Sequence, residues 1–268
     1  MSDFSNETFH LLATSDDMIP SRMNNPFHRS PTAIAKMAAN ILKNYIYDEM
    51  VENEKSWSKE TTHGKMFGVL VVRSEDGATG FLGAYSGQIG GREDWEGFVP
   101  AVFDYLQPDG HFKTTEAEIV EINKRIKALQ KDDTAECADD ASSRKASAKA
   151  KAEEITKLKA TRRKMSKELQ TWLFSQFVMI NKKGERKDLN EIFRERCGKQ
   201  PPSGSGECCA PKLLQYAFLH HYEPIAIAEF WLGTRPNSEN RMNRRFYGAC
   251  LNKCEPILHF MLNGEFHP

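Results

Sequence analysis

The chain has 268 residues with 37 acidic and 37 basic side chains, so its formal net charge is zero. Overall charge therefore gives no indication of a nucleic-acid or membrane partner, and only local patches can do so. No run of eighteen apolar residues is present, and the first residues lack the basic flank and apolar run of a signal peptide, which excludes a membrane span and predicts a cytoplasmic protein. In that compartment the six cysteines are expected to be thiols or metal ligands rather than disulfides.

The first 29 residues are polar, contain two prolines and predict an irregular arm. Within it, Phe9, Leu11 and Leu12 are the apolar residues that can fix the arm to the rest of the protein. Ser30 followed by Pro31 is typical of a helix start. Apolar residues then recur at helical spacing to about residue 50, which predicts a helix with one face in the core.

Residues 64–87 favour a β-hairpin. The segments KMFGVLVVR and FLGAYSG are rich in strand-forming residues, and SEDGATG between them is typical of a turn. The following segment, GFVPAVFDYLQPDGHF, is apolar but loop-like, so we expect it to pack against the sheet edge.

Residues 114–181 differ in character, because apolar residues recur there every three or four positions in two segments. This heptad spacing predicts two helices packed as an antiparallel coiled coil. The seam residues are Ile119, Ile122, Ile126 and Leu129 in the first segment, and Ile155, Leu158, Met165, Leu169 and Trp172 in the second. A polar break at residues 132–143 separates the segments, and the second seam has one polar step near Thr161.

The second helix of this hairpin is strongly basic. Ten basic and two acidic residues occur between Arg144 and Lys167. Such a stretch is typical of a solvated coiled-coil face, or of a surface that contacts the phosphate backbone of RNA. On the second interpretation, the RNA-binding residues are Arg162, Arg163, Lys164 and Lys167.

The last third of the chain alternates helices and loops around one strand. LNEIFRERC predicts a short helix, and the Pro/Ser/Gly-rich residues 201–206 predict a loop. Pro211 suits the first turn of a helix that runs to about His220, where His220 and His221 are expected to be surface or capping residues. IAIAEFW follows as a strand, and Pro256 can open another helix.

Four cysteines stand where these two helices begin. The partial positive charge of a helix N-terminus favours thiolate over thiol. Two helix starts that flank one strand can converge in space, so Cys250, Cys254 and either Cys208 or Cys209 are predicted to bind structural zinc. The fourth ligand stays open between Cys197, a histidine and water. Metal-free core thiols are the alternative, because the spacing is not that of a standard zinc knuckle.

The segments GECCAPKLLQYA, IAEFWLG and FYGACLNKCEPIL resemble the N-terminal region of long RluA-type pseudouridine synthases, which isomerise uridine in ribosomal and transfer RNA. GKMFGVLVV and GFVPAVFDYLQPDGHF extend the resemblance over most of residues 64–262. It implies an accessory region that positions RNA. The catalytic half of that family carries a His-Arg-Leu-Asp segment, whose Asp attacks the target nucleoside, and the present sequence lacks it. We therefore expect the accessory half alone, truncated or stand-alone, without isomerase activity and with the catalytic domain as its partner.

The order of helices and strands is also that of zinc nucleoside deaminases, which place metal ligands at two helix starts around such a sheet. The second cysteine pair departs from the deaminase pattern, because its spacing is C-x-x-x-C instead of C-x-x-C. Counted from Cys208, the deaminase glutamate would fall at Ala210, and neither Glu207 nor Glu229 has the required spacing. A deaminase-like zinc hydrolase is therefore one alternative function, and a structural zinc module that binds protein is another.

These patterns predict an α/β (α+β) fold in which a small sheet is flanked by helices, with a protruding antiparallel helical hairpin and a loosely deaminase-like topology. The expected boundaries are residues 1–29 for the arm, residues 30–113 and 182–268 for the α/β body, and residues 114–181 for the hairpin. The expected partner is ribosomal or transfer RNA, the expected cofactor is structural zinc, and no membrane partner is expected.

Overall fold

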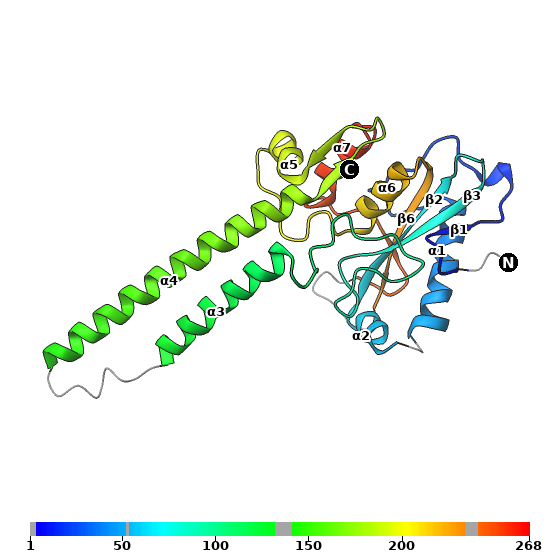
Figure 1. Cartoon of the computed structure of the whole chain (residues 1–268). Coiled ribbons are helices and arrows are strands. Elements are labelled where there is room, and N and C mark those ends of the chain that lie inside the picture. Colours follow the sequence, from blue (N-terminus) through cyan, green and yellow to red (C-terminus); the bar gives the residue numbers. More distant parts are fainter. Residues whose placement is uncertain (1–3, 52–53, 132–140, 234–240) are drawn as a thin grey trace. The chain divides into compact units, whose positions relative to one another are not determined.

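The computed structural model describes residues 4–51, 54–131, 141–233 and 241–268 (Figure 1). The chain divides into two compact units. Met1–Phe103 and Phe177–Pro268 form the first unit, called the body below, and Asp104–Gln176 form the second, called the helical unit. The predicted α/β fold class is confirmed, because the chain combines helices with an antiparallel sheet. Residues 132–140, which carry most of the predicted polar break, lie outside the described residues.

The main sheet of the body has five strands in the order β1-β3-β2-β6-β7, and each neighbouring pair is antiparallel. The strands are β1 (Phe9–Leu11), β2 (Lys65–Arg73), β3 (Thr79–Tyr85), β6 (Glu223–Leu232) and β7 (Phe246–Tyr247). β2 and β3 form the predicted hairpin, in which Val69 lies opposite Gly83. β6 contains the predicted IAIAEFW strand and pairs with β2 along its length.

The N-terminal arm is more regular than predicted. It contributes the edge strand β1 and a short 3-10 helix, η1 (Asp16–Met18). Leu12 is buried as expected, whereas Leu11 is 65% exposed, because successive residues of a strand point to opposite sides. Further along the arm, the Asn24 side-chain amide bonds both the backbone N–H and the C=O of Ile227, so the arm is also fixed beside β6.

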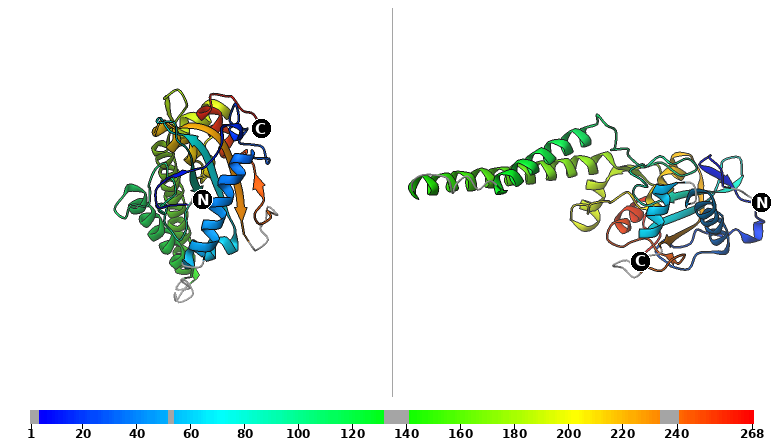
Figure 2. Two further views of the ribbon diagram at one scale, coloured as in Figure 1. Left: turned by 90° about the vertical axis from the view of Figure 1, so that its right-hand side faces the viewer. Right: turned by 90° about the horizontal axis from the view of Figure 1, so that it is seen from below.

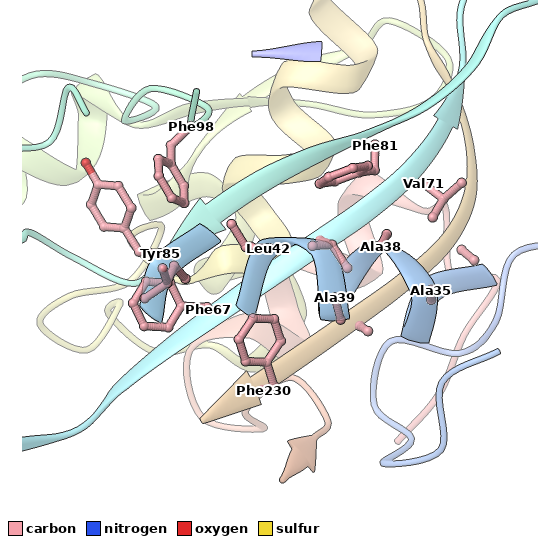
Figure 3. Packing of buried hydrophobic residues seen from close by; sticks show 14 of the residues in the cluster. Ala35, Ala38, Ala39, Leu42, Phe67, Val71, Phe81, Tyr85, Phe98 and Phe230 are labelled. Carbon is pink, nitrogen blue, oxygen red and sulfur yellow. The ribbon is translucent and has the colours of Figure 1, made fainter. Parts of the chain in front are cut away.

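One face of the sheet forms the main apolar core with α1 (Ala33–Tyr45) (Figure 3). Phe67, Val71 and Phe230 point to this face, where alanines of the helix let its backbone approach closely. Thr32 caps the helix by accepting a hydrogen bond from the backbone N–H of Ala35, so the helix begins two residues later than the predicted Ser30 start. The apolar residues whose spacing predicted this helix, such as Ile34, Ala38 and Leu42, are the ones that it buries in the core.

The opposite face of the sheet is covered by α6 (Cys209–Leu219). Gly68 of β2 permits this contact, because a Cβ at Gly68 would lie 2.8 Å from the Cβ of Cys209. The residue opposite Gly68 on β6 is Glu229. A carboxylate is therefore enclosed between the sheet and the first turn of α6.

The remaining elements of the body are shorter. They are the π-helical segment η2 (Ile46–Val51), α2 (Lys55–His63), β4 (Val178–Ile180), β5 (Arg186–Asp188), α5 (Leu189–Cys197) and α7 (Cys254–Met261). The predicted LNEIFRERC helix is α5, and it begins with a capping box in which Asp188 and Glu191 each bond the other's backbone N–H. The β4–β5 hairpin and α5 both contact α7.

The helical unit consists of α3 (His111–Lys131) and α4 (Ala141–Gln176), which lie side by side (Figure 2). They are antiparallel, because Arg125 pairs with Glu154 at 3.1 Å while the rings of His111 and Trp172, at the other ends, are 4.4 Å apart. The predicted coiled-coil hairpin is therefore present. Its second helix ends five residues before the predicted end, and β4 begins at Val178.

Candidate metal centre

Cys208 is held at the start of α6 by a constrained loop. It is the N-cap residue, with φ −75° and ψ 160°, so its side chain lies just outside the first turn. Gly206, two residues earlier, has φ +87°, and a Cβ there would lie 2.7 Å from the ring of Phe177. Only glycine fits both the left-handed backbone and the close approach. The Pro/Ser/Gly-rich loop therefore fixes the direction in which Cys208 enters the helix.

Cys250 and Cys254 are placed by one turn of backbone before α7. The N–H of Cys254 donates to the C=O of Cys250 at 3.2 Å. Cys254 is the first residue of the helix, and Pro256 occupies its first turn, where a missing backbone N–H costs no intrahelical bond. The C-x-x-x-C spacing thus brings both sulfurs to the same end of α7.

The sulfurs of Cys208, Cys250 and Cys254 meet between the two helix starts. All three lie within 4.8 Å of one another, and those of Cys250 and Cys254 are 3.3 Å apart. Cys254 is buried, and the other two are partly buried. The predicted convergence of the two segments is therefore present, and the cluster could hold a metal ion.

The thiols in this cluster share hydrogen bonds that favour one negative charge. The side-chain hydrogen bond with Cys208, followed in size by the one with Cys254, lowers the pKa of Cys250. The bond with Cys250 raises the pKa of Cys208, and the bonds with Cys208 and Cys250 raise the pKa of Cys254. The pKa of Cys250 is therefore the lowest of the three. A bound cation would replace those shared protons, because a coordinating thiol is deprotonated.

The structure separates Cys208 from its neighbour Cys209. Cys209 is fully buried, and its thiol donates to the C=O of Met66 at 3.4 Å. Burial raises its pKa well above the usual range. Cys209 is therefore a core residue that packs against Gly68. The sequence left open whether Cys208 or Cys209 joins the cluster, and the structure places Cys208 there.

No fourth histidine, cysteine or carboxylate ligand joins the cluster among the described residues. Cys197 is exposed and donates to the C=O of Phe193 within α5. His220 and His221 lie at the far end of α6, where both are exposed and His220 stacks on Tyr216. The sequence offered Cys197, a histidine or water as the fourth ligand. Because Cys197 and the histidines lie away from the cluster, water is the remaining candidate.

Glu229 lies near this cluster, although its spacing in the sequence did not fit the role of a deaminase glutamate. It is 7% exposed, and its Oε1 accepts a hydrogen bond from the backbone N–H of Ala210 at 3.0 Å. Burial raises its pKa to about 7, against the opposing effect of the Ala210 bond. The Glu229 carboxylate thus contacts the backbone of Ala210, which is the position that the deaminase pattern assigns to its glutamate. An acidic residue inside the apolar IAIAEFW strand was the signal for it.

The four predicted RNA-binding residues of α4 have different surroundings. Arg163 and Lys167 are exposed. Lys164 is exposed and lies 3.9 Å from Glu168. Arg162 does not lie on the outer face, because it is partly buried and its Nη1 donates to the Asn123 side chain of α3 at 2.9 Å.

The heptad register explains this placement of Arg162. It lies four residues after Leu158 and three before Met165, so it occupies the seam and is the polar step that the sequence located near Thr161. The other basic residues of α4 with exposed side chains are Lys145, Lys149, Lys157 and Lys159, while Lys151 is partly exposed. The side chain of Arg144 lies outside the described residues.

Comparison with known proteins gave no matching protein family, no matching curated protein and no matching solved structure. Among the helices that the structure describes, none combines the length and apolar character needed to cross a membrane.

Proposed function

We propose that Cys208, Cys250 and Cys254 bind a zinc ion. Zinc held tetrahedrally at about 2.3 Å from each sulfur places the sulfurs about 3.8 Å apart. The three sulfurs here lie within 4.8 Å of one another, so small side-chain rotations suffice to reach that spacing. Water completes the coordination. The zinc then joins α6 to α7, and its binding free energy stabilises the fold.

Metal analysis of the purified protein tests this assignment. About one zinc per chain is expected when the protein is prepared under reducing conditions, and Cys250→Ser and Cys254→Ser should lose the metal and melt at lower temperature. Cys197→Ser is the matched control, because Cys197 is exposed and outside the cluster. Zinc-free parent protein whose Cys254→Ser variant melts at an unchanged temperature would show that the cluster is only a packing feature.

We further propose that the chain is a non-catalytic, RNA-positioning region of an RluA-type pseudouridine synthase. The observation that carries this proposal is the outer face of α4, where Arg163, Lys164 and Lys167 are exposed together. A row of exposed basic residues on a helix can follow a phosphate backbone with little sequence preference. The sequence resemblance supplies the class of RNA, which is ribosomal or transfer RNA.

The RNA experiment is a fluorescence anisotropy titration with a structured ribosomal RNA fragment at low and moderate salt. We expect an affinity of about micromolar strength or weaker that falls steeply with salt, because binding rests on counterion release. Changing Arg163, Lys164 and Lys167 to Glu should abolish it. The matched control reverses Lys182, Lys183 and Arg186 of the β4–β5 hairpin. Equal binding by the α4 variant and its parent would exclude α4 as the RNA surface.

An isomerisation assay tests the non-catalytic part of the proposal. The His-Arg-Leu-Asp segment that supplies the attacking carboxylate in the family is absent from this sequence. We expect no conversion of uridine to pseudouridine in ribosomal or transfer RNA by this chain. Turnover above a buffer control would contradict the assignment as an accessory region.

A second candidate function is favoured by Glu229 alone. Its carboxylate lies 3.0 Å from the N–H of Ala210 and close to the start of α6, so it stands near where a deaminase places its acid–base glutamate. In such a hydrolase, water adds to an amino-bearing ring carbon, Glu229 carries the proton from that water to the amine, and ammonia leaves. Ammonia release from cytidine or adenosine that Glu229→Gln abolishes would establish this function in place of the first one.

A further inference from the structure

Two of the three clustered sulfurs are close enough to form a covalent bond with each other. The Sγ atoms of Cys250 and Cys254 lie 3.3 Å apart, and the N–H of Cys254 donates to the C=O of Cys250 as in one turn of a helix. Residues one such turn apart have Cα atoms about 6 Å from each other. Disulfides span Cα separations of about 4.4–6.8 Å, so side-chain rotation is enough to join Cys250 to Cys254.

These two cysteines differ in their exposure to solvent. Cys250 is partly exposed and precedes Leu251, which is 59% exposed, whereas Cys254 is 1% exposed. A small oxidant in solution therefore reaches the sulfur of Cys250 first, and the buried sulfur of Cys254 lies beside it. An accessible thiol with a second thiol next to it is the usual arrangement of a redox-sensitive site, because the second thiol captures the oxidised form of the first.

Two other described cysteines do not share this arrangement. Cys209 is fully buried, and its thiol donates to the C=O of Met66. Cys197 is exposed, and its thiol donates to the C=O of Phe193. Neither belongs to the three-sulfur cluster. A redox reaction that pairs two cysteines is therefore expected at the cluster and not at these two positions.

We infer that the proposed zinc centre is a redox switch, in which hydrogen peroxide joins Cys250 to Cys254 and thereby releases the metal. This inference rests on the proposed zinc site and adds its regulation. Zinc is held by thiolate sulfur, and a disulfide offers it none. After the reaction Cys208 is the single thiolate that remains of the three, and one thiolate is too few to retain the ion.

The reaction takes place in two steps. The Cys250 thiolate attacks one oxygen of the peroxide, so an S–O bond forms, the O–O bond breaks, and hydroxide leaves; the product is a sulfenic acid. The Cys254 thiolate then attacks the Cys250 sulfur, so the S–S bond forms and a second hydroxide leaves. Two protons from solvent convert both hydroxides to water. The two sulfurs together lose two electrons, and the peroxide gains them.

The switch changes which parts of the body are linked. A zinc ion on all three cysteines connects Cys208, at the start of α6, to the segment at the start of α7. The disulfide closes only one turn of backbone and leaves α6 unconnected. A link that closes a shorter loop restricts the unfolded chain less, so the oxidised protein should be less stable than the zinc-bound protein. Its melting temperature should fall about as far as that of Cys208→Ser, which removes the same connection.

The test measures zinc, thiols and the disulfide in the full chain. The parent carries Cys137→Ser, which lies outside the described residues, and Cys197→Ser, so that four of the six cysteines remain. Hydrogen peroxide is added to the zinc-loaded parent in the presence of a zinc indicator dye. We expect about one zinc released per chain while the thiol count in denaturant falls from four to two. Peptide mass mapping should find Cys250 joined to Cys254, and dithiothreitol with added zinc should restore the starting state.

Two metal-free variants provide matched controls for the assigned pair. After chelation, Cys208→Ser should still form the disulfide, because Cys208 is not one of its partners. Cys254→Ser should form none and should accumulate oxidised Cys250 instead. Circular dichroism checks that both variants fold, and mass mapping of the metal-free parent gives the reference.

The remaining outcomes overturn the inference in distinguishable ways. Zinc that stays bound, with four thiols left after peroxide treatment, would exclude the switch and leave the zinc site in place. A disulfide that includes Cys208 or Cys209 would exclude the assigned pair. A parent that holds no zinc when purified under reducing conditions would exclude the zinc site, and the inference with it. Zinc analysis before the peroxide is added therefore separates failure of the proposed site from failure of the switch.

Discussion

A buried histidine gives a quantitative prediction for how the stability of this protein depends on pH. His10 on β1 is 1% exposed. Its Nε2 lies 2.8 Å from the C=O of Gly97, and its Nδ1 lies 3.2 Å from the backbone N–H of Ser5. The neutral ring satisfies both contacts, with Nε2–H donating to Gly97 and Nδ1 accepting from Ser5. A proton on Nδ1 would face the Ser5 N–H and lose that bond.

The sign and size of the effect follow from the pKa of His10. Burial lowers it from 6.5 to about 4, against the opposing effect of the Gly97 bond. Between these values the folded state binds fewer protons than the unfolded state, so stability that is complete above pH 6.5 is lost as the pH falls towards 4. The whole shift corresponds to about 3 kcal/mol. About 2 kcal/mol of it should be lost between pH 7.5 and pH 5.

Urea unfolding of the parent and of His10→Gln at both pH values measures this contribution. His10→Gln removes the titrating ring, so the loss of unfolding free energy on going to pH 5 should be smaller in the variant by about 2 kcal/mol. The control is His63→Gln, which makes the same substitution at an exposed histidine of α2. If the parent and His10→Gln lose the same free energy between the two pH values, His10 is not held neutral as described.

Three further substitutions test the fold. Asp188→Ala removes the capping box of α5 and should lower the unfolding free energy by about 1 kcal/mol in urea, with Asp188→Asn as the milder control. Phe230→Ala empties a fully buried position of the main core and should cost about 3–5 kcal/mol, seen as a large drop in melting temperature. Gly248→Ala forces a Cβ against Phe27 and should speed proteolysis of the N-terminal arm while the core keeps its circular dichroism spectrum; an unchanged cleavage rate would contradict the close approach.

Local sequence patterns were enough to predict most of the elements. The helix α1, the β2–β3 hairpin, the strand β6, and the helices α5 and α6 follow from periodicity, prolines and turn residues, because each is determined by neighbours within a few positions. The antiparallel pairing of α3 with α4 was also predictable, since a heptad seam specifies the face that each helix buries. Convergence of the two cysteine segments was predicted from their common position at helix starts.

Only the tertiary structure decided which side chains meet. Cys208 and Cys209 are adjacent in sequence, and the packing of α6 on the sheet at Gly68 turns one into the core and the other towards Cys250. Sequence spacing could not place Glu229, because its approach to Ala210 depends on the register between β6 and β2. The N-terminal strand β1 was missed for the same reason: a three-residue edge strand has little local preference, and its formation depends on hydrogen bonds offered by β3, some seventy residues away in the chain.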